Sequence, residues 1–187
     1  MVNSKITPYE ELKQHLSKEF LGGRKKFAWR RIALRYWRQP NLRFMFWWRI
    51  ANCLYSQGGK RKVKLARRIH RKLVSQYNTD IGLGAQIGTG FKIYHFAGIV
   101  ICPQAVIGEN LRIRQNTTIG LKTVDGVKAI RIGDNVEIGA NTCIIGDDLT
   151  IGDNVTIGAM SFVNKDIPEN SVFITRKISS IIDSDAN

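Results

Sequence analysis

Aliphatic residues recur every six positions through the second half of the chain. The repeat begins at Ile81-Gly82 and Ile87-Gly88 and continues as far as Ile157-Gly158. A period of six fits neither an α-helix nor a long alternating strand, because a short strand and a tight corner use up each unit. The pattern therefore predicts a solenoid, in which aliphatic side chains point to the axis and stack from one coil to the next. Gly, Asn and Asp between them tolerate the positive φ that corners require.

The frame of this repeat changes at three places. It shifts by two residues between Ile99 and Ile101, breaks at about residues 121 to 131, and gains one residue in Asp147-Asp148-Leu149. More than ten positions nevertheless stay in register as Ile or Val over about 85 residues, so chance is a poor explanation.

The first half of the chain has a different pattern, with apolar positions at helical spacing. Glycine pairs and a Gln-Pro step separate the segments. The pattern predicts four helices, at residues 8–20, 24–38, 41–56 and 60–77. The domain boundaries expected from both halves are residues 1–77 for a basic, aromatic-rich helical region, 78–170 for the solenoid and 171–187 for a tail.

Charge is concentrated in one part of the chain. The formal net charge is +14, and residues 21–79 hold 17 Lys or Arg with no Asp or Glu, whereas residues 80–187 hold 9 bases and 12 acids. All four tryptophans also fall in the basic part, between arginines. Aromatic rings flanked by cations are typical of helices that lie in an anionic membrane interface.

Residues 24–77 are therefore expected to associate peripherally with an anionic membrane surface. The alternatives are that the rings pack on one another and on the first coil, or that the region binds an anionic glycan or a lipid-linked sugar. Specific nucleic-acid binding is not expected, because no recognised nucleic-acid module is present. No run of 18 apolar residues exists, so no span is expected either.

Cysteine usage and the N-terminus indicate the compartment. The three cysteines are widely spaced and show no metal-ligand rhythm, which is typical of a reduced cytoplasm. Glu10 and Glu11 interrupt the N-terminal segment, which does not resemble a secretory signal. We expect a cytoplasmic protein at the inner face of the membrane.

One histidine is the candidate catalytic base. Of the three histidines, only His95 lies in the repeat, where it interrupts the aliphatic pattern. Imidazole titrates near neutrality and suits removal of a hydroxyl proton. Asp80 lies fifteen residues earlier, at the opening of the preceding coil. The alternatives are a structural histidine and a solvated corner aspartate.

The repeat [LIV]-G-x-x-x-x resembles that of the hexapeptide acyltransferase family. The resemblance implies a mainly β fold, a left-handed parallel β-helix with three hexapeptides per coil, here preceded by an α-helical region. Residues 79–88 followed by His95-Phe96-Ala97-Gly98-Ile99-Val100 are similar to the serine acetyltransferase branch. In that branch the histidine is the general base and the aspartate orients it, which implies these roles for His95 and Asp80.

Two departures from that branch bear on the acceptor. The branch has an acid directly before its histidine, where this chain has Tyr94, and a loop with His and Arg, where residues 121–130 have neither. These departures favour a saccharide hydroxyl over serine, and the chain then resembles acetyltransferases of capsular and exopolysaccharide gene clusters. A serine O-acetyltransferase and a non-catalytic trimeric membrane scaffold are the alternatives.

The resemblance also implies the donor and the assembly. The donor is acetyl-CoA, whose pantetheine arm lies along the solenoid edge between neighbouring subunits of a homotrimer. No metal is expected, since a zinc site of the γ-carbonic-anhydrase type needs three histidines and the repeat has one. The candidate CoA contacts are Gly120, Ala140 and Ala159 for the arm and Lys165, Arg176 and Lys177 for the phosphates.

Overall fold

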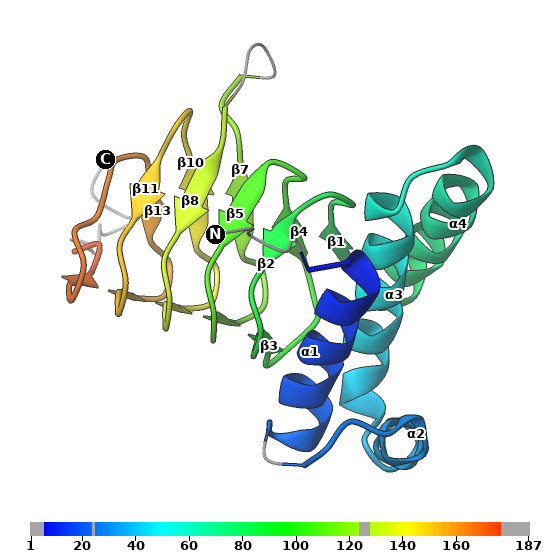
Figure 1. Ribbon diagram of the computed structural model, residues 1–187. Helices are drawn as coiled ribbons and strands as arrows, with labels where there is room; N and C mark the ends of the chain where they lie inside the picture. Colours follow the sequence, from blue (N-terminus) through cyan, green and yellow to red (C-terminus); the bar gives the residue numbers. More distant parts are fainter. Residues whose placement is uncertain (1–5, 24, 124–127, 177–187) are drawn as a thin grey trace, which may run out of the picture.

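A bundle of helices abuts one end of a parallel β-solenoid (Figure 1). The computed structural model describes residues 6–23, 25–123 and 128–176. The helices come first in the chain, and the solenoid then extends away from them, one coil after another.

The described part of the helical region contains four α-helices. The first begins with a capping box, in which the Thr7 hydroxyl accepts from the Glu10 N–H and the Glu10 carboxylate accepts from the Thr7 N–H, and it ends at Gly22 with φ 71°. The second begins at Trp29 rather than at residue 24 as the sequence pattern predicts. The helices are α1 (Pro8–Leu21), α2 (Trp29–Arg38), α3 (Arg43–Ser56) and α4 (Lys60–Tyr77), with a 3-10 turn η1 (Pro40–Leu42) before α3.

The solenoid consists of three parallel sheets, one along each side. The first has the order β1-β4-β7-β10-β13, the second β11-β8-β5-β2 and the third β14-β12-β9-β6-β3. Every neighbour in a sheet belongs to the next coil, as a solenoid of short repeats requires. The strands are β1 (Thr79–Ile81), β2 (Gln86–Ile87), β3 (Lys92–Ile93), β4 (Ile99–Ile101), β5 (Ala105–Ile107), β6 (Arg112–Ile113), β7 (Thr118–Gly120), β8 (Ile130–Ile132), β9 (Glu137–Ile138), β10 (Cys143–Ile145), β11 (Thr150–Ile151), β12 (Thr156–Ile157), β13 (Phe162–Val163) and β14 (Val172–Phe173).

The aliphatic repeat forms the core of the solenoid. In the first sheet, register aligns Ile81, Ile101, Ile119, Ile144 and Val163, and none of these side chains is more than 1% exposed. Burying each such side chain contributes about 1.5–3 kcal/mol. The predicted parallel solenoid with an N-terminal helical region is confirmed, whereas "mainly β" is too strong, because the described helices contain more residues than the short strands.

Corner residues with positive φ form a column along the solenoid. Asn116, Asn141 and Met160 follow Gly98 at equivalent positions, with φ values between 54° and 67°. The Asn116 amide donates to the Asn141 side-chain oxygen at 2.9 Å. Asparagine and glycine suit this conformation, whereas methionine is strained in it.

Helix α3 caps the open edge of the first coil. Trp48 Nε1 donates to the Ile81 carbonyl at 2.9 Å, and Asn52 both donates to the Ala85 carbonyl at 3.0 Å and accepts from the Gly84 N–H at 2.8 Å. These bonds satisfy polar backbone groups that have no further coil on that side to pair with.

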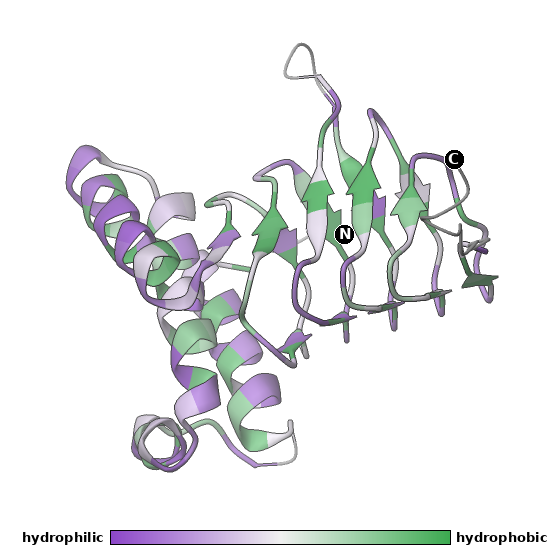
Figure 2. Ribbon diagram, turned by 180° about the vertical axis from the view of Figure 1, so that it is seen from behind, coloured by the Kyte–Doolittle hydropathy of each residue, from purple (hydrophilic) through white to green (hydrophobic). Residues whose placement is uncertain are grey.

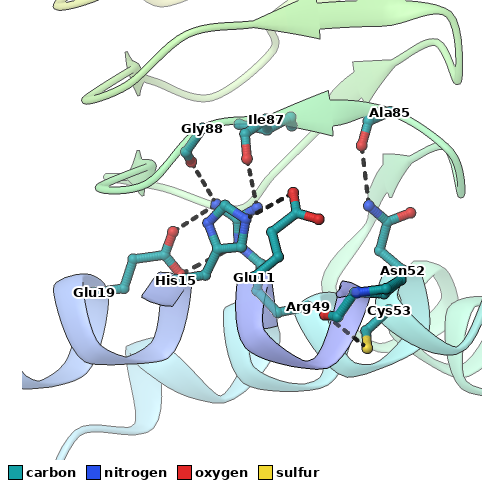
Figure 3. Close-up of polar contacts among 10 residues, drawn as sticks. Glu11, His15, Glu19, Arg49, Asn52, Cys53, Ala85, Ile87 and Gly88 are labelled. Carbon is teal, nitrogen blue, oxygen red and sulfur yellow. Dashed lines mark hydrogen bonds and ion pairs between the residues drawn. The ribbon is translucent and has the colours of Figure 1, made fainter. Parts of the chain in front are cut away.

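The Arg49 guanidinium completes this cap (Figure 3). It donates to the Ile87 carbonyl at 2.7 Å, to the Gly88 carbonyl at 2.8 Å and to Glu19 of α1 at 2.6 Å. Arg49 and Glu19 are almost fully buried, with side chains 3% and 4% exposed. A single buried cation therefore ties together α1, α3 and the solenoid.

His15 of α1 lies beside this cation and is itself buried. Burial, and secondarily the positive charge of Arg49, lower the pKa of His15 from 6.5 to about 3. The imidazole is therefore neutral in the folded protein at physiological pH.

Replacing the strained methionine in the corner column is expected to stabilise the solenoid. Met160→Asn extends the asparagine column and relieves about 1 kcal/mol of left-handed strain. Urea unfolding monitored by circular dichroism measures the gain. Met160→Leu is the matched control, since it keeps the strain and gains nothing; an equal gain from both variants contradicts this explanation.

His15 is expected to make the protein sensitive to acid. The unfolded chain binds a proton at His15 below its ordinary pKa of 6.5, whereas the folded chain binds it only near its lowered pKa of about 3. Stability is therefore complete above pH 6.5 and falls between these values by up to about 1.4 kcal/mol per pH unit.

Urea unfolding across this range, for wild type and His15→Leu, measures the effect. The variant's stability is expected to depend less steeply on pH than that of wild type. Met160→Leu, which changes no titratable group, serves as control and keeps the wild-type slope. Parallel curves for wild type and His15→Leu would show that His15 is not the responsible group.

Candidate active site

His95 lies in the corner segment Tyr94–Gly98, between the third and first sheets. Paired residues of the two coils are 20 positions apart in the sequence before this segment and 18 positions apart after it. The segment therefore has two more residues than Arg114–Asn116, against which it stacks. The insertion matches the frame shift seen in the sequence. The imidazole is exposed and, within the described chain, has no side-chain hydrogen bond.

The neighbours of His95 fix this corner in place. The Phe96 carbonyl accepts a hydrogen bond from the Thr79 hydroxyl, and the Gly98 N–H donates to the Asn78 carbonyl at 2.8 Å. The Phe96 ring packs on Phe44 of α3 and Tyr77 of α4, at centroid distances of 5.2 and 5.6 Å. The helical region thus positions the segment that carries the candidate base.

Asp80 lies next to the same hydrogen bond, on β1. Its carboxylate is half-exposed, and its Oδ1 lies 3.1 Å from Nε2 of His70 on α4. Asp80 and His95 are therefore the chain neighbours of one contact, that of Thr79 with Phe96, but the Asp80 carboxylate itself lies against the His70 ring. Nothing in the helical pattern of α4 indicated that His70 would meet the start of the solenoid.

Two of the expected CoA contacts share the edge of the solenoid with His95. We call this the site edge, made of residues 94–98, 114–116, 139–141 and 158–160. Ala140 and Ala159 lie at equivalent positions of successive coils. The coils approach closely here, because a Cβ added at Gly139 would lie only 2.4 Å from the Ala159 nitrogen. Arg176 stands two residues after Ile174, and Ile174 lies against Gly158 at the end of this edge. Small corner residues leave backbone groups open to a long ligand.

The other expected contacts lie elsewhere. Gly120 ends β7 and pairs in register with Ile145, on the edge between the first and second sheets, and Lys165 follows β13 at the corresponding corner. Lys177 lies outside the described residues, as do residues 124–127 of the predicted acceptor loop. Both described ends of that loop are held by Asp147, which accepts from Lys128 at 2.9 Å and from the Thr123 N–H at 3.1 Å. The bond from Lys128 lowers the pKa of Asp147.

The solenoid cysteines are poor candidates for a thiolate nucleophile. Burial raises the pKa of Cys102 and of Cys143, so both thiols are protonated near neutral pH. No group of three or more His, Cys, Asp or Glu able to hold a metal ion occurs within the described ranges. The exposed imidazole of His95 is the remaining candidate, and imidazole suits general-base chemistry on a hydroxyl.

Comparison with known proteins first indicates the class. Residues 129–165 match the family model described as bacterial transferase hexapeptide (six repeats). This agrees with the six-residue period and the stacked parallel coils, so the predicted resemblance to hexapeptide-repeat acyltransferases is confirmed.

Individual relatives then indicate the branch. The chain is 38% identical over 72 residues to serine acetyltransferase 1, chloroplastic, of Arabidopsis thaliana, covering 38% of this chain and 22% of that protein. It superposes on serine acetyltransferase isoform 3 of Entamoeba histolytica in complex with cysteine, with TM-score 0.72, 29% identity and coverage of 96% of this chain and 62% of the other. It also superposes on Neisseria gonorrhoeae serine acetyltransferase in complex with serine, with TM-score 0.68, 28% identity and coverage of 88% and 65%.

The similarity to the serine acetyltransferase branch, predicted from the residues around His95, is therefore confirmed. The chain spans about a fifth of the length of the first curated relative and about three-fifths of the first solved structure.

The contact between Asp80 and His70 is expected to be detectable in solution. Asp80→Asn removes the charge that faces the His70 imidazole at 3.1 Å, so the ring resonances of His70 should shift. Two-dimensional NMR of histidine-labelled protein measures this, because the chain has only three histidines to assign. His15, buried on α1, serves as the internal reference and should not move. An unchanged His70 would mean that the ion pair does not persist.

Proposed function

We propose that the protein is an acetyl-CoA-dependent O-acetyltransferase with His95 as its general base. The proposal rests on one observation: His95 lies on the same edge of the solenoid as the small corner residues Ala140 and Ala159. The similarity to serine acetyltransferases supports the same chemistry.

The proposed mechanism is direct transfer. His95 takes the proton of the acceptor hydroxyl as its oxygen attacks the thioester carbonyl, a new C–O ester bond forms and the C–S bond breaks. The proton then passes from His95 to the sulfur of coenzyme A. Backbone N–H groups of the site edge stabilise the oxyanion.

Asp80 is proposed to orient the imidazole of His95. The two residues are the chain neighbours of Thr79 and Phe96, whose hydrogen bond joins their segments. In the structure the half-exposed Asp80 carboxylate lies against His70, so this role requires Asp80 to turn toward His95.

Serine is the acceptor that the comparisons favour. The relatives with curated names and the superposed structures are serine acetyltransferases, and one is a complex with serine. The saccharide acceptor expected from the sequence receives no such support. It stays as the second candidate because Tyr94 stands where that branch has an acid and the loop of residues 121–130 contains no Arg or His. Tyr94 instead packs with Lys92 and Arg114, at 4.8 and 5.1 Å from its ring centroid.

The remaining parts of the proposal concern donor, winding and assembly. Acetyl-CoA lies along the site edge in a left-handed solenoid, with Arg176 near its phosphates, and a second subunit covers it in a homotrimer. Exposed apolar side chains on the outer face of the first sheet, Val100 at 44% and Phe162 at 55%, offer a surface for such self-association.

Acetyl transfer from radiolabelled acetyl-CoA tests the proposal. The acceptors are free serine and a panel of bacterial polysaccharides, and the enzymes are wild type and His95→Asn. Loss of the base is expected to lower transfer by at least about a hundredfold. Gln104→Ala, at an exposed corner between the first and second sheets, is the matched control and should keep full activity.

Each outcome distinguishes the candidates. Label in serine alone identifies a serine acetyltransferase, and label in a glycan alone identifies the saccharide enzyme. Transfer that survives His95→Asn removes His95 from the mechanism. No transfer to any acceptor favours the non-catalytic scaffold.

A further inference from the structure

Helix α2 presents an unpartnered face that the proposed acetyl transfer does not use. Ile32 is the one residue of this helix that is buried, whereas Trp37 is 73% exposed, Leu34 57% and Trp29 44%. At about 100° per residue, Arg30, Leu34 and Trp37 lie on the side of the helix opposite Ile32. This side faces away from the bundle, whereas Trp29 lies nearer to Ile32 and packs edge-to-face on Phe27 at 5.1 Å.

Arginines flank these rings. Arg30 lies on the exposed side with Trp37 and Leu34, and Arg38 lies at the edge of this side. No acid occurs between residues 21 and 79, so the charges of this face have no local partner in the sequence. Arg49, in contrast, is neutralised by Glu19 and belongs to the core.

We propose that the exposed side of α2 docks onto the anionic surface of a lipid bilayer. Tryptophan rings rest at headgroup depth, Leu34 enters the acyl boundary, and the arginines meet lipid phosphates. The arginines of this side favour an anionic partner. The exposed Leu34 favours lipid over nucleic acid, because a nucleic-acid surface uses aromatic rings for stacking on bases and cations for phosphates, and has no use for an exposed leucine. None of the described helices is long and apolar enough to cross a membrane. Figure 2 shows hydrophilic and hydrophobic residues alternating along the helices of the bundle.

Vesicle flotation with the full chain tests the proposal. Wild type should float with vesicles of phosphatidylcholine mixed with phosphatidylglycerol, and not with phosphatidylcholine alone. Binding should weaken as salt is added, because surface charges are screened. Tryptophan fluorescence should be quenched by brominated acyl chains in the same vesicles.

Two pairs of variants separate charge from insertion. Arg30→Gln with Arg38→Gln should weaken vesicle binding by about fivefold for each arginine removed. Leu34→Ser with Trp37→Ser should remove quenching and most binding. The matched controls, Arg112→Gln and Val172→Ser, change an exposed cation and an exposed apolar residue of the solenoid and should bind as wild type does.

Several results would overturn the proposal. Equal flotation with neutral and anionic vesicles removes the role of charge, and unchanged binding of the α2 variants removes this face. Binding to duplex RNA or DNA in preference to vesicles, lost in the same variants, identifies a nucleic-acid surface instead. Self-association lost in the Leu34 and Trp37 variant makes the face an interface between copies. Circular dichroism confirms in each case that the variant is folded.

Discussion

The structure depends on how the first coil of the solenoid ends. A parallel solenoid leaves a row of unpaired backbone groups at its first edge, and such an edge either pairs with another chain or must be covered. Three side chains of α3 cover it here: Trp48, Arg49 and Asn52 bond to the backbone of the first coil. Because these bonds are directional and Arg49 is buried with Glu19, they fix α1 and α3 in one orientation on the solenoid. The helical bundle is therefore part of the folding unit rather than an appendage.

This junction also places the chemistry. Phe96 is held between rings of α3 and α4, and its neighbour His95 is carried on the outside of the same corner. Asp80 is in turn held by His70 of α4. The candidate base and its carboxylate thus both rest on contacts with the helices, although both belong to the solenoid by sequence. A change in the packing of α4 would reach the site through Phe96 and His70 without touching either reacting group.

Much of the solenoid could be predicted from the sequence, because its determinants are local. Each Ile at a six-residue interval meets the next Ile along the axis, and the residues between them must turn, so spacing alone specifies the stacking. Even the extra residues around His95 are visible as a shift of frame. The junction could not be predicted, because nothing in the pattern of α3 distinguishes Arg49, a buried cation, from the other arginines nearby. The partner of Asp80 was missed for the same reason: His70 meets it through tertiary packing. The start of α2 was placed too early because the basic residues before Trp29 have good helical propensity.

The solenoid has two corners at which the number of residues per coil changes. Residues that pair between neighbouring coils are 20 positions apart in the sequence before the His95 corner and 18 positions apart after it. Pairs that span the segment between Gly120 and Ile130 are 25 positions apart. In both places the strands before and after remain paired, so the additional residues leave the stacked wall intact. The length of these corners can therefore change without disturbing the stacked strands, provided that the residues that hold the His95 corner, such as Phe96, are kept. A lineage could exchange one acceptor for another by altering these segments alone, while the wall and its cap stay the same.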